Sequence, residues 1–243
     1  KSISPSIFAR RDVAARRLRQ VCDFRMSAAQ AQRLCADNLT AVLDEYVDGR
    51  LVPGVLAVVT DVDRIVYTGA SGVAQRRAGI AMAPDTIFRI ASMTKVMTSM
   101  AVLMLVDEGL VELDAPLSRY VPGYRQPPVL RLFDHASGQY ETRPAREDVT
   151  VRRLLSHTSG YGYWFLDERL LQLVDGEPDL LHAPFLIDEP GSHWHYSTST
   201  DVLAQLIEPV SGQPLETFFA QRLGKPLGMR DPGFDLPANT ERL

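Results

Sequence analysis

Three stretches of the sequence predict a fold that mixes α-helices with β-strands. Residues 27–46 carry apolar side chains at roughly helical spacing, residues 55–68 contain two β-branched runs around a polar turn, and residues 92–108 form a long apolar run. The chain has 243 residues, of which 45% are hydrophobic and 23% are charged. These values indicate an ordinary globular protein with one large domain or two small ones.

The first predicted helix begins at Ser27, which suits an N-cap, and extends to Tyr46. Gly49 and Pro53-Gly54 end it. The β-branched runs at 55–60 and 65–68 flank a polar turn, so they predict a β-hairpin. We expect this helix and this hairpin to pack together.

A long helix is predicted next, from Ser92 to Glu108. Gly109 follows it and suits the position after the helix, which favours a positive φ. The helix is apolar nearly all round, so we expect it at the centre of its domain.

The segment over residues 112–149 is predicted to be an irregular covering loop, because it has little periodicity and five prolines, at 116, 122, 127, 128 and 144. After it, Thr150 caps a short predicted helix over 151–155. A further helix over 201–210 ends at Ser211-Gly212, and Pro214 begins another that extends to about residue 223.

Charge and cysteine content exclude several classes of protein. The 26 basic and 30 acidic residues give a net charge of -4 without a large cationic surface, so we expect no nucleic-acid partner. We interpret the densest basic run as a solvated helix face rather than as an arm that binds an anionic partner; it comprises Arg10, Arg11, Arg16, Arg17 and Arg19. Cys22 and Cys35 match no disulfide scaffold or zinc motif and are predicted to be reduced thiols.

Localisation is predicted from the apolar runs. The chain begins without the apolar core of a signal peptide, and its longest nearly apolar run, 96–106, is too short to span a bilayer. We therefore expect a cytoplasmic protein with no membrane partner. Because the chain does not begin with Met, a leader removed earlier stays an alternative.

Ser92 and Lys95 lie about one helical turn apart on one face of the long helix. A serine needs a neighbouring base to become a nucleophile, and a lysine with its ordinary pKa of about 10.4 is charged near neutral pH. Burial and the positive end of the helix dipole disfavour that charge, so Lys95 is a candidate base. The helix terminus also directs N–H groups towards an oxyanion near Ser92. The simple alternative is that Ser92 only caps the helix and Lys95 extends into solvent, which would give the same spacing.

Two further motifs favour catalysis over that simple alternative. They are Leu154-Leu-Ser-His-Thr-Ser-Gly160 and His195-Tyr-Ser-Thr-Ser-Thr-Asp201. With Ser92-Met-Thr-Lys95, in this order, the chain resembles the serine β-lactamase-like superfamily, which includes penicillin-binding proteins, class C β-lactamases and family VIII carboxylesterases. The resemblance covers about residue 40 to the end and is closest to the family VIII carboxylesterases.

This resemblance implies that Ser92 is the nucleophile, Lys95 the partner that shares its proton, and Tyr196 the general base and acid. A tyrosine has an ordinary pKa of about 10, so it needs the neighbouring cationic lysine for this role. Lys95 and Tyr196 titrate together, so which of the two side chains holds the proton depends on both groups.

The implied fold class is α/β (α+β), with an antiparallel β-sheet flanked by helices, a mostly helical lobe, and the site between them. We expect an N-terminal arm over 1–26 and the helix and hairpin of the sheet domain over 27–91. The nucleophile helix and helical lobe follow over 92–210, and residues 211–243 return towards the sheet domain.

The sequence departs from the superfamily pattern in two places. Thr198 stands where class C β-lactamases and penicillin-binding enzymes usually have an asparagine, which predicts poor recognition of lactams. The third motif, a Lys-Thr-Gly, His-x-Gly or Trp-x-Gly strand, is absent from the 243 residues. We therefore expect the N-terminal part of a longer esterase, with the C-terminal strands missing from this chain or present as a separate fragment.

Candidate substrate-binding residues lie around these motifs: Thr198, Trp194, Tyr161, Tyr163 and Trp164. Core packing is nearly as good an interpretation of each aromatic residue. His193 and His195 lie on one face of an extended segment, as metal ligands do, but no third ligand has a recognisable spacing. A serine mechanism needs no metal or cofactor, so we expect neither, and we interpret His157 as structural.

The leading interpretation is a carboxylesterase that cleaves short-chain esters through an acyl-enzyme on Ser92. The alternatives are a β-lactamase or D-amino-acid peptidase of the same superfamily, with weak β-lactam binding, and an acyltransferase that uses an alcohol other than water. A protein of another class, a non-catalytic module that retains only the ligand pocket, is also consistent with the sequence.

Overall fold

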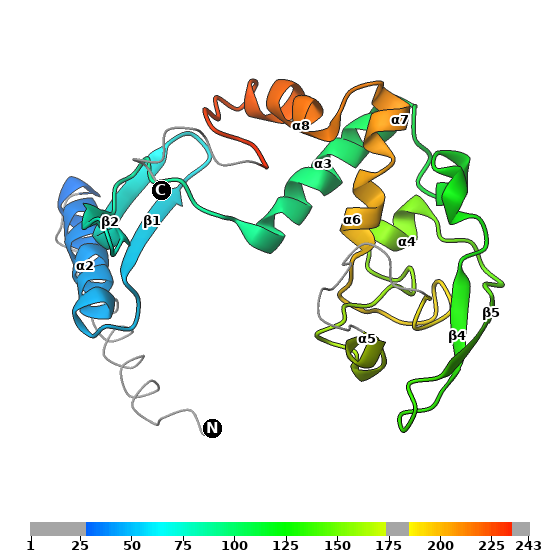
Figure 1. Cartoon of the computed structure of the whole chain (residues 1–243). Coiled ribbons are helices and arrows are strands. Elements are labelled where there is room, and N and C mark those ends of the chain that lie inside the picture. Colours follow the sequence, from blue (N-terminus) through cyan, green and yellow to red (C-terminus); the bar gives the residue numbers. More distant parts are fainter. Residues whose placement is uncertain (1–27, 174–184, 235–243) are drawn as a thin grey trace. The chain divides into compact units, whose positions relative to one another are not determined.

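The computed structural model describes residues 28–173 and 185–234, which form two compact units whose sequence boundary lies between Arg89 and Ile90. Figure 1 colours the first unit blue to cyan and the second mainly green to orange. The predicted N-terminal arm, with its arginines and Cys22, lies outside the described residues. Within the described part of the chain, every helix is too short or too polar to cross a membrane.

The first unit contains the predicted helix and hairpin. Helix α2 (Ala28–Asp48) is followed by an antiparallel sheet of three strands in the order β1 (Gly54–Thr60), β2 (Ile65–Gln75) and β3 (Ile80–Ala81). Helix α2 lies along the sheet (Figure 1), and Thr40 Oγ1 is 3.0 Å from the Tyr67 hydroxyl of β2. The predicted packing of helix against hairpin is therefore confirmed.

One glycine of this sheet is required by its geometry. Gly72 pairs with Gly54 and has a φ of +80°. A Cβ atom at position 72 would lie 2.4 Å from the Pro53 carbonyl oxygen. Both the positive φ and this close approach exclude a larger residue.

The second unit is mostly helical, with one two-stranded sheet. Its elements are η1 (Ala91–Met93), α3 (Thr94–Asp107), η2 (Leu117–Arg119), η3 (Pro122–Tyr124), β4 (Pro128–Phe133), β5 (Tyr140–Pro144), α4 (Val151–Leu155), α5 (Glu168–Leu173), α6 (Ser199–Ala204), α7 (Ile207–Ser211), α8 (Leu215–Phe218) and η4 (Phe219–Gly224). As predicted, Thr150 caps α4 by accepting a hydrogen bond from Arg153 N, and Gly109 has a φ of +71°. The fold class, helices with antiparallel sheet, is the predicted one.

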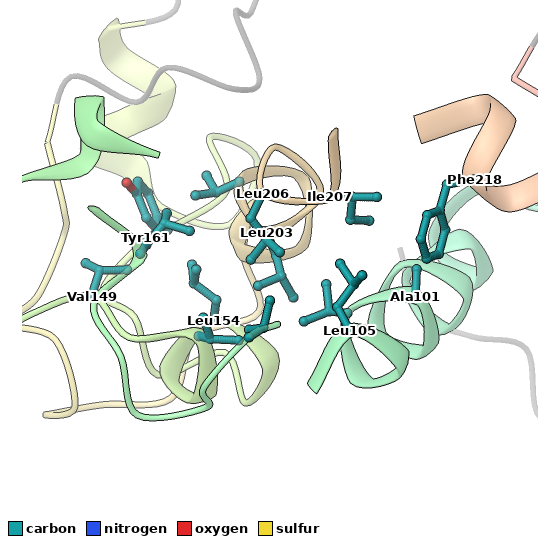
Figure 2. Close-up of a cluster of buried hydrophobic side chains, with 14 of the residues drawn as sticks. Ala101, Leu105, Val149, Leu154, Tyr161, Leu203, Leu206, Ile207 and Phe218 are labelled. Atoms are coloured by element: carbon teal, nitrogen blue, oxygen red, sulfur yellow. The ribbon is translucent and has the colours of Figure 1, made fainter. Parts of the chain in front are cut away.

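The core of the second unit is built on one face of α3. Ala101, Val102 and Leu105 are fully buried there. Figure 2 shows side chains from α3, α4, α6, α7 and α8 gathered in one apolar cluster. Because α3 contributes several side chains to this cluster, packing holds the helix in place.

The other face of α3 corrects the expectation that the helix is covered on all sides. Val96, Met100 and Leu103 of α3 are 62%, 43% and 44% exposed, and Met93, in the turn before the helix, is 64% exposed. The sequence shows which side chains of a helix are apolar. Which other elements pack against those side chains depends on the tertiary structure. In the described part of the chain, these four side chains remain accessible.

Two other predictions on local structure were wrong. Residues 128–144, predicted to be irregular, form the β4–β5 hairpin, in which Pro128 and Pro144 are paired at its open end. Prolines at that position interrupt no interior hydrogen bond. The helix predicted over 201–210 is instead divided into α6 and α7. Pro209 has no N–H to donate to the Gln205 carbonyl, which accounts for the division.

Candidate active site

Ser92 and Lys95 lie at the start of α3, at a strained turn. Ser92 belongs to the 3-10 turn η1, which precedes α3, and Lys95 Nζ is 3.5 Å from Ser92 Oγ. The preceding residue, Ala91, has a φ of +45°, which costs an L-residue about 1–2 kcal/mol. Strain of this kind persists only where the surrounding structure enforces it, and it concentrates at functional sites. Ser92 is exposed, so its hydroxyl is accessible.

Lys95 is held between two tyrosines that are distant in sequence. Its Nζ donates a 2.9 Å hydrogen bond to the Tyr163 hydroxyl and lies 5.0 Å from the ring centroid of Tyr196. The Tyr163 hydroxyl donates in turn to Asp201 Oδ2, at 3.4 Å. A chain of hydrogen bonds therefore runs from the lysine to a carboxylate through a phenol.

These contacts determine where the shared proton resides. Burial opposes the charge on Lys95, but hydrogen bonds with Tyr163 and Tyr196 outweigh it, and the pKa of Lys95 lies above its ordinary value of 10.5. Hydrogen bonding with Ser92, reinforced by Lys95, lowers the pKa of Tyr196 below 10.0, although burial opposes this shift. Burial raises the pKa of Tyr163.

The directions of these pKa shifts correct one step of the sequence argument, in which burial and the helix terminus lowered the pKa of Lys95. The phenol oxygens of Tyr163 and Tyr196 stabilise the charged ammonium group and reverse that balance. Lys95 therefore remains cationic, and Tyr196 is the member of the pair that more readily loses its proton.

The two sequence motifs meet beneath Tyr196. His157 O accepts a 2.9 Å hydrogen bond from His195 N, and His157 Nδ1 is 3.2 Å from Ser197 Oγ. Ser199 Oγ lies within 2.7 Å of both Ser197 Oγ and Ser159 Oγ, in a fully buried cluster. The His157 ring packs 5.0 Å from the Tyr196 ring. This network fixes the backbone that carries Tyr196, which supports the structural interpretation of His157.

Two pockets adjoin these residues. The larger, of about 700 Å³, is lined by Ser92 and Lys95 together with Thr98 of α3, Asp201 of α6 and Gln205, which follows α6. A smaller pocket of about 260 Å³ is lined in part by Tyr163, Trp194, His195 and Tyr196. A substrate acyl group therefore has apolar and polar walls available beside Ser92.

The predicted substrate-binding residues occupy different environments. Tyr163 and Trp194 line the smaller pocket. Tyr161 lies in the hydrophobic core and is 5% exposed, and Trp164 packs half-buried against a second small cluster. Thr198 is 3% exposed, so its hydroxyl does not face either pocket. For Tyr161 and Thr198, the structure thus corrects the prediction that they line the site, because both side chains face the interior.

The sequence assigned no role to two acidic residues of this region. Asp201, the last residue of one of the motifs, accepts from Tyr163 and lines the larger pocket. Asp188 lies beside His193 and His195, and the three form a cluster of potential metal ligands. Asp188 is seven residues from His195 and has no recognisable motif around it, so spacing alone could not have assigned it.

The sequence of this chain is similar to those of known proteins. The Beta-lactamase family matches residues 39–242. The chain is 40% identical to Esterase EstB of Burkholderia gladioli over 223 residues, which are 85% of this chain and 53% of that protein. It is 34% identical to Monacolin J acid methylbutanoyltransferase of Aspergillus terreus, over 65% of this chain and 40% of that one.

The fold of this chain is similar to those of solved structures. Simvastatin Synthase (LovD) from Aspergillus terreus superposes with a TM-score of 0.72 and 29% identity, over 82% of this chain and 54% of that one. EstCE1, described as a hydrolase with promiscuous acyltransferase activity, gives 0.68 and 28%, over 84% and 54%. The chain spans about half the length of these relatives. Its matched residues and its fold together show that the chain belongs to the Beta-lactamase family, with an esterase and acyltransferases among its relatives.

Proposed function

We propose that this protein is a serine hydrolase that cleaves short-chain carboxylic esters through an acyl-enzyme on Ser92. The observation that carries the proposal is the position of Lys95, whose Nζ lies within reach of Ser92 Oγ and is hydrogen-bonded to Tyr163 beneath Tyr196. A lysine held there as a cation lowers the free energy of the Tyr196 phenolate, which is the base that Ser92 requires.

The proton transfers follow from the directions of the pKa shifts. Tyr196, as phenolate, takes the proton of Ser92 Oγ while that oxygen bonds to the ester carbonyl carbon and the carbonyl becomes an oxyanion. The C–O bond to the alcohol then breaks, and Tyr196 returns its proton to the departing alkoxide. Water attacks the acyl-enzyme in the same manner: Tyr196 removes its proton, the acid leaves, and Ser92 Oγ recovers the proton. Lys95 stays charged throughout.

Two features support an ester rather than a lactam as the substrate. Thr198, at the position where lactam-binding relatives usually have an asparagine, is buried, so no side-chain amide or hydroxyl from this position is offered to a substrate. The relative EstB, at 40% identity, is an esterase. A likeness to the family VIII carboxylesterases is part of this proposal.

Acyl transfer to an alcohol other than water is the second candidate. Relatives of this chain are named as acyltransferases, and EstCE1 is described as combining hydrolysis with transfer. The two activities share the covalent step on Ser92 and differ only in which hydroxyl attacks the acyl-enzyme. A chain that binds a ligand without turnover is the third alternative.

Trapping the acyl-enzyme tests the proposal directly. The 243-residue chain is mixed with p-nitrophenyl butyrate, denatured within seconds, and analysed by intact-mass spectrometry and peptide mapping. We expect one butyryl group per chain, on the peptide that contains Ser92. Ser92→Ala removes it, whereas the matched control Ser99→Ala, a serine of the same helix, keeps it.

The outcomes separate the candidates. An unmodified wild-type chain, or a butyryl group that persists in Ser92→Ala, would overturn the nucleophile assignment. If acylation occurs, adding a primary alcohol distinguishes hydrolysis from transfer, because a transferase forms the new butyryl ester in preference to butyrate. Acylation by a cephalosporin at a rate equal to that by the ester would refute the preference for esters.

A further inference from the structure

Three potential metal ligands converge beside the segment that carries Tyr196. One ligand atom from each of Asp188, His193 and His195 lies within 4.8 Å of the other two. His195 Nε2 is 2.6 Å from Asp188 Oδ2, and His193 Nδ1 is 3.6 Å from Asp188 Oδ1. Each carboxylate oxygen therefore faces a different imidazole, and the two histidine rings lie 6.1 Å apart.

Two of these three side chains are attached to rigid parts of the fold. Asp188 directly follows the buried residues 185–187, in which Leu186 is hydrogen-bonded to Leu130 and Pro128 of β4. The backbone of His195 is fixed by its hydrogen bond to His157 O. A site whose ligands are held before binding loses less conformational entropy when the ion binds.

His193 supplies the adaptable ligand. It lies on the exposed turn after Gly191, and its side chain is 65% exposed. Around a tetrahedral zinc ion with bonds of about 2.0–2.1 Å, neighbouring ligand atoms lie about 3.3 Å apart. The three ligand atoms here lie within 4.8 Å of one another, so rotations of the partly exposed side chains that move their tips by about an ångström would bring them to that spacing.

We propose that Asp188, His193 and His195 bind one Zn²⁺ ion. Two imidazoles and one carboxylate are ligands that zinc prefers, and water would complete the tetrahedron. The ion would take the place of the hydrogen shared by His195 Nε2 and Asp188 Oδ2, while the neutral imidazole keeps its proton on Nδ1. The carboxylate compensates one of the two positive charges. This site is separate from Ser92, and the inference does not depend on the proposed esterase activity.

Zinc binding is tested by equilibrium dialysis of the tag-free 243-residue chain after its metals have been stripped. We expect one zinc ion per chain. His193→Ala and the conservative Asp188→Asn should each weaken binding about tenfold or more. His135→Ala, which removes an exposed imidazole outside the cluster, should retain the ion. Failure of the wild-type chain to retain zinc, or equal loss in His135→Ala, would overturn the proposal.

A second readout locates the ion without measuring activity. The chain has two tryptophans, and Trp194 lies between the two histidines. Trp164→Phe leaves Trp194 as the only tryptophan, and the buried Trp164 Nε1 has no hydrogen-bond partner among the residues that the structure describes. Cu²⁺, which binds such ligands more tightly than Zn²⁺, should quench Trp194 fluorescence at one equivalent. Zn²⁺ should compete with it. Undiminished quenching after a further His193→Ala change would contradict the assigned site.

Discussion

Tyr163→Phe tests whether the hydrogen bond from Lys95 to Tyr163 supports catalysis. The change removes one oxygen, which accepts a 2.9 Å hydrogen bond from a charged Nζ and donates to Asp201. The phenyl ring that remains can still stack on Phe165, whose ring centroid lies 4.7 Å away. The fold should therefore be retained, and the variant isolates the hydroxyl.

The expected magnitude follows from the kind of hydrogen bond. A bond to a charged group is worth about 1.5–3 kcal/mol, and solvent around the half-buried Lys95 places this one near the lower end, at about 1.5 kcal/mol. If that energy holds Lys95 beneath Tyr196, its loss lowers kcat/KM for p-nitrophenyl butyrate about tenfold. Tyr196→Phe, which removes the proposed base, should lower kcat/KM by about 10²–10⁴-fold.

The pH profile gives a sharper criterion. Tyr163 raises the pKa of Lys95, so its loss lowers that pKa. Because the mechanism requires a cationic Lys95, the alkaline limb of kcat/KM should move to lower pH. Tyr161→Phe is the matched control, since Tyr161 is buried in the core and Lys95 donates its hydrogen bond to Tyr163 instead. Equal rates and pH profiles for the two variants would refute the role assigned to the Tyr163 hydroxyl.

Three further predictions follow from the structure. Ester hydrolysis should rise with pH as Tyr196 loses its proton, at a pH below the ordinary phenol pKa of 10.0, and stopped-flow release of p-nitrophenol should show no such limb in Tyr196→Phe. Leu105→Ala should destabilise the chain by about 2–5 kcal/mol in urea unfolding. Leu103→Ala, on the exposed face of the same helix, should cost about 0.5 kcal/mol or less, and equal costs would contradict the assigned core. Thr150→Ala should cost about 1 kcal/mol in the same assay because Arg153 N loses its capping oxygen, and an unchanged midpoint would argue against the cap.

The elements that could be predicted are those governed by neighbouring residues. Helical spacing placed α2 close to its observed bounds, and β-branched runs around a polar turn placed β1 and β2. Thr150 and Gly109 took the expected positions at helix termini because capping and positive φ are properties of one or two residues.

The elements that could not be predicted depend on distant partners. The β4–β5 hairpin was hidden by its prolines, which are harmless only because Pro128 pairs with Pro144 at the open end. The exposure of one face of α3 depends on which elements pack against it, and the sequence of the helix contains no information on that.

The sequence by itself determined the pair Ser92 and Lys95, because three residues of helix bring them to one face whatever surrounds them. Tyr196 entered through the motifs that the chain shares with its superfamily. Only the tertiary structure decided that Tyr163, 68 residues from Lys95, accepts its hydrogen bond, and that Asp188 joins the two histidines. The charge state of Lys95 also belongs to the tertiary structure, since a pKa is determined by the dipoles and charges within a few ångströms of a group, whatever their distance along the chain.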